Sequence, residues 1–184
     1  MTFARTLCVV ISLLCAGPLA AQEATPETMD DVAPTSASFT APDVGPETNM
    51  PLPRYVSLKA KEANVRRGPS LTHRIDWVFK RRDMPLQVIA EYGHWRRVID
   101  RDGQGGWVHY TMLSGVRTVI VDQDRMALRA NPSDTAAERA ELEQNVIARL
   151  GDCEGDWCEL TAGGYSGWAH RSVLWGVDAA PAPN

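Results

Sequence analysis

The stretch CEGDWC, from Cys153 to Cys158, places two thiols five positions apart around acidic residues, a glycine and a tryptophan. Paired thiols at such a spacing can form a disulfide, act as a redox pair or contribute to a metal site. Redox motifs usually keep two residues between the cysteines, whereas four stand between them here. A structural zinc site needs four ligands; His170 is a candidate third ligand, and a fourth is not evident. The pattern therefore favours a structural disulfide over the redox and metal alternatives.

The first 21 residues have the features of a secretory signal peptide. Arg5 gives a basic start, the run LCVVISLL at residues 7–14 is apolar, and small residues follow it. The apolar run is shorter than the roughly 20 residues that a membrane-spanning helix needs. We therefore expect cleavage after Ala20 or Ala21 and no transmembrane span in the mature protein. An uncleaved membrane anchor and a lipoprotein signal are the alternatives.

Cleavage of the signal peptide changes the cysteine count. It removes Cys8 and Cys15 and leaves only Cys153 and Cys158. The mature chain would then be periplasmic or secreted, in an oxidising compartment where paired cysteines form disulfides. The predicted localisation and the predicted disulfide thus support each other.

Residues 22–53 differ in composition from the central part of the chain. They contain six prolines and six acidic residues but no lysine or arginine, and few large apolar residues. A segment of this kind cannot bury a core, which predicts a disordered, acidic, proline-rich linker. Residues 178–184 have the composition of a tail. The folded part is expected between these two segments.

Three patterns recur in the folded part at offsets of 63, 62 and 61 residues. NVRRGPS, from Asn64, is followed by ALRANPS, from Ala127. EYGHWR, from Glu91, corresponds to CEGDWC, and GGWVHYTML, from Gly105, corresponds to SGWAHRSVL, from Ser166. The order is the same in both copies, which indicates a tandem duplication. Each copy shows short β-prone runs separated by glycine-containing turns, a pattern typical of a small all-β barrel.

Each copy resembles the bacterial SH3-like domain. Members of that family open with an LNVRSGPS-like segment, continue with a Gly-x-Trp-x-x-Val hairpin, and close with a GWV strand and a short turn ending in leucine. The first copy matches this pattern at Asn64-Val65-Arg66-Arg67-Gly68-Pro69-Ser70, Gly93, Trp95, Val98, Gly106-Trp107-Val108 and Leu113. The second copy departs from it at Asn131, Leu160 and Ala169. The resemblance implies two tandem SH3-like barrels, at residues 54–116 and 117–177.

The alignment of the two copies gives CEGDWC a structural context. Cys153 corresponds to Glu91 and Cys158 to Arg96. Positions that flank a hairpin turn face each other across the strands. We therefore expect a Glu91–Arg96 ion pair in the first barrel at the place of the disulfide in the second. Val98 and Val108 are expected to face the interior, and Trp95 and Trp107 to add apolar area to the same core.

Histidines recur in the copies as Trp-x-His, at His109 and His170. They are either part of a ligand surface with an aromatic floor or caps of the closing turn. No combination of nucleophile, base and orienting residue is evident, and the glycine-rich stretches lack the Lys-Ser/Thr of a phosphate loop. The sequence therefore predicts a protein that is not an enzyme and has no cofactor and no metal.

The net charge of the chain, −4, conceals two opposite halves. Residues 54–118 hold 13 basic and 6 acidic side chains, and residues 119–184 hold 5 basic and 11 acidic ones. Either the halves dock against each other or the first barrel binds an anionic partner. Nucleic acid fits the charge but not the compartment.

Some relatives of this domain class recognise peptidoglycan peptides, so the resemblance implies a periplasmic binding module for such peptides or for another anionic envelope ligand. The hypothesised ligand-binding residues are Arg66, Arg67, Trp95, Trp107 and Tyr110. The alternative is a structural or assembly protein that binds other envelope proteins and has no small ligand.

Overall fold

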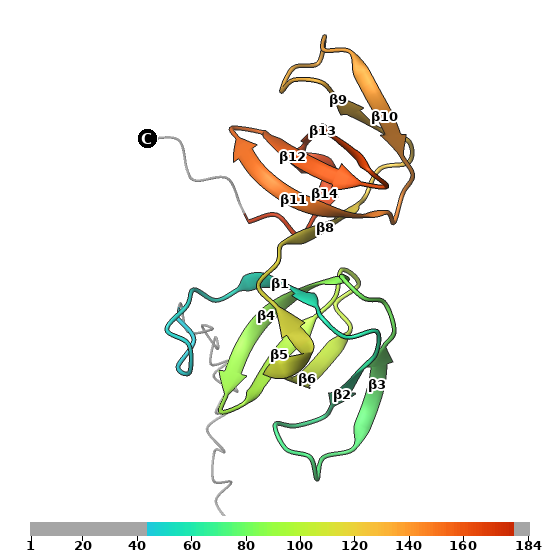
Figure 1. Ribbon diagram of the computed structural model, residues 1–184. Helices are drawn as coiled ribbons and strands as arrows, with labels where there is room; N and C mark the ends of the chain where they lie inside the picture. Colours follow the sequence, from blue (N-terminus) through green and yellow to red (C-terminus); the bar gives the residue numbers. More distant parts are fainter. Residues whose placement is uncertain (1–43, 179–184) are drawn as a thin grey trace, which may run out of the picture. The chain divides into compact units, whose positions relative to one another are not determined.

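The computed structural model describes residues 44–178 (Figure 1). The predicted signal peptide, the first part of the predicted linker and the last six residues lie outside the described residues. No helix in the described part of the chain is long and apolar enough to cross a membrane.

The described residues form two antiparallel sheets of seven strands each. The first sheet consists of β1 (Arg54–Leu58), β2 (Ala63–Arg66), β3 (Ile75–Phe79), β4 (Pro85–Tyr92), β5 (Trp95–Ile99), β6 (Gly105–His109) and β7 (Leu113–Ser114). The second consists of β8 (Thr118–Val121), β9 (Met126–Arg129), β10 (Glu138–Leu142), β11 (Ile147–Glu154), β12 (Trp157–Ala162), β13 (Tyr165–His170) and β14 (Leu174–Trp175). Short 3₁₀ turns, η1 (Tyr110–Met112) and η2 (Arg171–Val173), precede β7 and β14.

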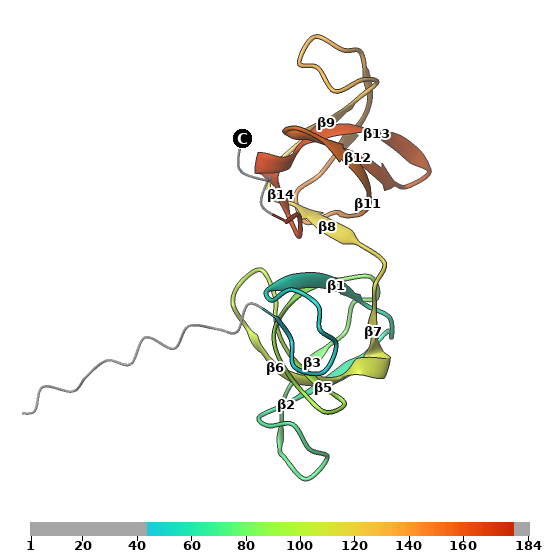
Figure 2. The ribbon, with the colours of Figure 1, turned by 90° about the vertical axis from the view of Figure 1, so that its left-hand side faces the viewer.

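The strand order is β3-β2-β6-β5-β4-β1-β7 in the first sheet and β10-β9-β13-β12-β11-β8-β14 in the second, so the two sheets have the same connectivity. Each sheet curls into a small barrel, and Figure 2 shows the strands of the first one around a small interior. The predicted all-β fold with two tandem barrels is confirmed.

The interior of each barrel contains the apolar positions that recur in the repeat. Val98 and Val108 are fully buried in the first barrel, and their counterparts Leu160 and Ala169 are buried in the second. Trp95 and Trp107 are only half-buried, because they alternate with buried residues along β5 and β6 and so lie on the outer face. The expectation that they add to the core is wrong.

A β-bulge in β4 changes which side chains point inward. The pairing with β5 shifts between Val88 and Ala90, and one extra residue reverses the alternation of faces. Without the bulge, Glu91 would face the same side as Gln87, opposite to Val88. With the bulge it faces the interior and is buried. A corresponding shift occurs in β11 between Leu150 and Cys153.

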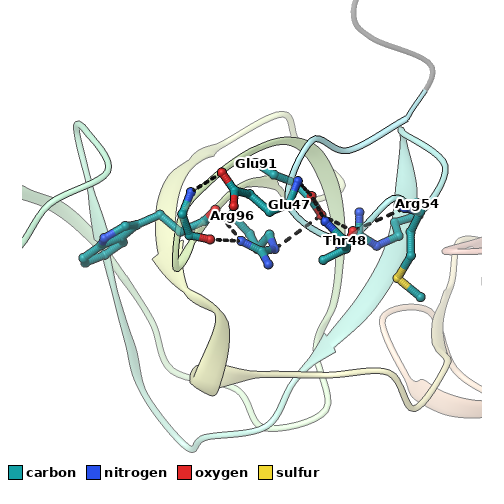
Figure 3. Close-up of polar contacts among 8 residues, drawn as sticks. Glu47, Thr48, Arg54, Glu91 and Arg96 are labelled. Carbon is teal, nitrogen blue, oxygen red and sulfur yellow. Dashed lines mark hydrogen bonds and ion pairs between the residues drawn. The ribbon is translucent and has the colours of Figure 1, made fainter.

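The buried carboxylate of Glu91 organises the chain that leads into β1 (Figure 3). Its oxygens accept hydrogen bonds from the backbone N–H of Thr48 at 2.9 Å, the Thr48 hydroxyl at 2.7 Å and the Arg54 guanidinium at 2.6 Å. Arg96 Nε lies 3.4 Å away. The predicted Glu91–Arg96 pair is thus present, but it is buried and shared with Arg54.

Residues 44–53, which we call the strap, pack onto the first barrel. Glu47 accepts a hydrogen bond from the backbone N–H of Gly93 at 2.8 Å, and Leu52 belongs to the first core. A disordered linker over residues 22–53 is therefore wrong for its last ten residues. Proline and acid content predicted disorder there because composition does not reveal a buried acceptor such as Glu91 elsewhere in the chain.

In the second barrel a covalent bond occupies the equivalent place. Cys153 and Cys158 pair across β11 and β12 as Glu91 and Arg96 do across β4 and β5. The two cysteines form a disulfide, as predicted. The second hairpin is therefore closed without any strap.

Glu91→Gln should destabilise the first barrel by about 3 kcal/mol, because the buried Arg96 and the half-buried Arg54 would lose their counter-charge. Burial alone would raise the pKa of Glu91, but hydrogen bonds from Thr48 and Arg54 outweigh it and hold the pKa below its ordinary value. A lowered folded-state pKa contributes stability at neutral pH that is lost as the pH falls through it. Hydrogen exchange of the β4–β5 amides at pH 7 and pH 3 measures both effects, and the pH dependence should shrink in the variant. Glu62→Gln, at an exposed position of the same barrel, is the control, and equal losses in the two variants would contradict the assignment.

Reduction of the disulfide should weaken only the second barrel. A bridge that closes so short a loop contributes roughly 2 kcal/mol. Mass-spectrometric hydrogen exchange with and without a phosphine reductant should show faster exchange in β11–β12 and no change in β4–β5. The Cys153→Ser/Cys158→Ser protein should not respond to the reductant. A response in the first barrel as well would refute an independent role for the bridge.

Candidate functional site

Three strands of the first barrel bring one row of side chains to its outer face. Arg97 pairs with Trp107 across β5 and β6, and Trp107 pairs with Arg66 across β6 and β2. Trp95 pairs with His109, two residues further along the same two strands. Directly paired residues lie on the same side of a sheet. These five residues form a continuous surface, which we call the first aromatic face.

The glycine of the recurring Gly-Trp pair allows β6 and its counterpart β13 to approach the neighbouring strand. A Cβ atom on Gly106 would lie 2.7 Å from the carbonyl oxygen of Arg66, and one on Gly167 would lie 2.8 Å from that of Arg129. Both distances are shorter than real Cβ contacts, so any larger residue would push the strands apart. The tryptophan that follows is therefore held beside the arginine in both barrels.

Arg66 supports the loop beside this face. Its Nη1 donates to the backbone carbonyls of Leu71 at 2.9 Å and His73 at 2.7 Å. Arg129, its counterpart, donates in the same way to the carbonyl of Ala136 at 2.9 Å. Since the contact recurs in both barrels, positioning of the loop accounts for the recurrence of this arginine.

Arg97 is the cation of the first aromatic face that remains available. It is exposed, and within residues 44–178 its guanidinium has no hydrogen bond or ion pair. It lies two residues after Trp95, on the same face of β5, and pairs with Trp107 across the strands, so an indole lies on each of two sides. The sequence could have identified Arg97, because residues two positions apart on a strand face the same side and Arg97 follows Trp95 by two.

A cavity of about 370 Å³ opens beside Arg97 on the first aromatic face. Its lining includes Arg66, Arg67, Asp76 and Trp107. Arg67 is mostly exposed and pairs with Asp76 at 3.0 Å. Hydrogen bonds from Arg67 and Arg74 lower the pKa of Asp76 below its ordinary value, so this carboxylate stays charged and balances one of the arginines.

A second cavity, also of about 370 Å³, lies along the same face. Arg66, Leu71, Trp95 and His109 are among the residues that line it. The Trp95 and His109 rings meet edge to face, with centroids 5.4 Å apart. The two cavities place four of the five predicted site residues on one surface.

Tyr110, the fifth predicted residue, lies elsewhere. It begins the turn η1, is exposed, and lies with its ring centroid 5.0 Å from that of His109 and 5.6 Å from that of His94. It lines a different cavity, next to Arg54 and Arg96. Tyr110 therefore borders the first aromatic face without belonging to either of its cavities.

The recurring histidines contact side chains of the closing turns. His170 Nδ1 lies 2.7 Å from the hydroxyl of Ser172 and accepts a hydrogen bond from its backbone N–H. His109 Nδ1 lies 2.8 Å from the hydroxyl of Thr111. His170 thus caps its turn, whereas the His109 side chain contacts only the Thr111 side chain within η1. Both histidines also meet a tryptophan ring edge to face, so the interpretation as an aromatic surface has contacts in both barrels. In the described part of the chain, no group of three or more His, Cys, Asp or Glu residues is placed to hold a metal ion.

The similarity of this chain to individual known proteins is low. No curated protein matches this chain. The similar solved structures include NlpC2 and NlpC1 from Trichomonas vaginalis, each with 14% identity and a TM-score of 0.32. The matches cover 70% and 66% of this chain and 51% and 45% of those chains, so the chain spans about half their length.

The family comparison is more specific than the structural one. The model of the bacterial SH3 domain matches residues 59–115 and again residues 122–176. The two matches fall on the two sheets and together cover more than half of the chain. This chain belongs to the bacterial SH3 domain family and carries the domain twice in tandem.

Proposed function

We propose that the protein is a non-enzymatic, periplasmic or secreted binding protein, and that its first aromatic face binds carboxylate groups of peptidoglycan peptides. The observation that carries the proposal is Arg97, exposed and without a partner in the described part of the chain, between the half-buried indoles of Trp95 and Trp107. Membership in the bacterial SH3 domain family supports a binding role.

The side chains of the first aromatic face suit a short peptide with a free carboxylate. A guanidinium offers two parallel N–H donors that match the two oxygens of a carboxylate. The flat indoles beside it offer apolar contact to the small side chains and backbone of such a peptide. Arg66 adds a second positive charge at the same cavity while its Nη1 holds the loop.

The charge of the whole first barrel points in the same direction. Residues 54–118 carry 13 basic and 6 acidic side chains, and a net positive charge concentrates anions near the surface. The predicted signal peptide supports an envelope location. Peptidoglycan meets both conditions, because its peptides carry free carboxylates and it lies in the envelope.

Arg97→Ala should reduce binding of the 22–184 protein to purified peptidoglycan sacculi by about fivefold or more, in proportion to the loss of one charge-assisted contact. Co-sedimentation at 50 and 500 mM salt would measure it, and binding of the unaltered protein should fall at the higher salt because exposed charges are screened. Arg82→Ala, also exposed and in the same barrel, is the matched control and should leave binding unchanged.

Equal binding by the Arg97→Ala and Arg82→Ala proteins would mean that the overall positive charge of the first barrel, rather than the first aromatic face, accounts for binding. Absence of sedimentation at both salt concentrations would reject peptidoglycan as the ligand. That result would favour an assembly protein that binds other envelope proteins, and crosslinking in the periplasm would then identify the partner.

A further inference from the structure

The second barrel repeats the first aromatic face with one change of sign. Trp168 pairs with Glu159 across β13 and β12 and with Arg129 on β9. Trp157 pairs with His170, two residues along the same two strands. Glu159 stands where the first barrel has Arg97, because Arg97 pairs with Trp107 in the same way. We call this surface the second aromatic face.

The carboxylate of Glu159 is available to a ligand. Glu159 is half-buried, and within residues 44–178 its side chain has no hydrogen bond or ion pair. Trp157 precedes it on the same face of β12, and Trp168 lies opposite. The bulge in β11 adds room, because Gly151 lies next to Glu159 and a Cβ there would lie 3.3 Å from its Oε2. Glu159 therefore shares its outer face with two tryptophans, and a carboxylate beside indole rings suits a positively charged group.

Two of the basic side chains nearby are directed to other groups. Arg129 Nη2 lies 3.7 Å from Glu138, an acidic residue that replaces the apolar Ile75 of the first barrel. Arg139 Nη1 is directed to the carbonyl of Ser166 at 3.4 Å. The described residues from 119 to 178 carry 5 basic and 11 acidic side chains in all, so the surrounding field also attracts cations.

We propose that the second aromatic face is a binding site for a primary ammonium group, held by the Glu159 carboxylate and the faces of Trp157 and Trp168. An ammonium gains from a carboxylate by charge and from an indole face by cation–π attraction. The same backbone frame therefore selects opposite charges in the two barrels, through the single exchange of Arg97 for Glu159.

This proposal goes beyond the proposed function, and neither depends on the other. The proposed function requires a carboxylate at Arg97 in the first barrel. The ammonium site requires only contacts within the second. A partner that carries both free amino groups and free carboxylates would satisfy both faces, but each can be tested with its own probe.

The probe for the second aromatic face is Nα-acetyl-lysine amide, compared with the neutral, nearly isosteric Nα-acetyl-norleucine amide. Two-dimensional ¹H–¹⁵N NMR of the 22–184 protein resolves the indole N–H signals, which Trp→Phe variants assign. The lysine derivative should shift the Trp157 and Trp168 signals saturably and leave those of Trp95 and Trp107 in place. The norleucine derivative should shift none of them. This comparison needs no variant of Glu159 and therefore does not depend on how the variant folds.

Glu159→Gln keeps the shape of the side chain and removes its charge. It should weaken binding of the lysine derivative by about fivefold, the size of one exposed ion-pair contact. Glu143→Gln removes an equal charge from an exposed turn of the same barrel and is the matched control, expected to stay within about twofold. Equal shifts with both derivatives, or equal weakening by both variants, would overturn the proposal, since either result means that the Glu159 charge does not select the ligand.

Discussion

In each barrel, the two residues that flank a hairpin turn contact each other across the strands, at the β4–β5 turn in the first barrel and the β11–β12 turn in the second. This contact closes the hairpin that carries the proposed site. In both barrels a bulge turns the residue before the turn toward its partner on the next strand. The first barrel closes this contact with the buried carboxylate of Glu91 and the second with the Cys153–Cys158 disulfide. The carboxylate also binds the strap, so residues 44–53 pack with the first barrel although they precede its first strand.

Closure of these hairpins also fixes the outer faces, which carry the proposed sites. Once Arg96 and Cys158 point inward, the residues on either side of each must point outward. These are Trp95 and Arg97 in the first barrel, and Trp157 and Glu159 in the second. The neighbouring strand supplies a second tryptophan to each face, held close by Gly106 or Gly167. The duplication thus preserved the aromatic frame while the charge at its centre changed sign.

The fold could be predicted from the sequence because its signals are local and occur twice. The Pro-Ser turn, the Gly-Trp strand and the alternation around Val98 each depend on neighbouring residues, and the second copy repeats all three. The burial of Glu91 could not be predicted, because one extra residue in β4 reverses the faces and no residue type marks that bulge. The packing of the strap depends on the same event, since its backbone N–H groups need the inward-turned carboxylate.

The candidate site was predicted in part. Trp95 and Trp107 were identified because they recur, and Arg66 because it lies in the family motif. Arg66 holds a loop in addition to lining the site. Arg97 was missed because it does not recur: its counterpart is Glu159, and a comparison of copies emphasises what they share. The residues that differ between two copies of one frame are those that can give each copy its own ligand.

The most direct test is an NMR titration of the 22–184 protein with acetyl-alanyl-alanine, which carries a free carboxylate, and with the amide of the same dipeptide. If the first aromatic face recognises carboxylates, the acid should shift the indole signals of Trp95 and Trp107 saturably. The amide should shift them far less, and Arg97→Ala should abolish the difference. Identical shifts with acid and amide, or a difference that survives in Arg97→Ala, would contradict carboxylate recognition by this face.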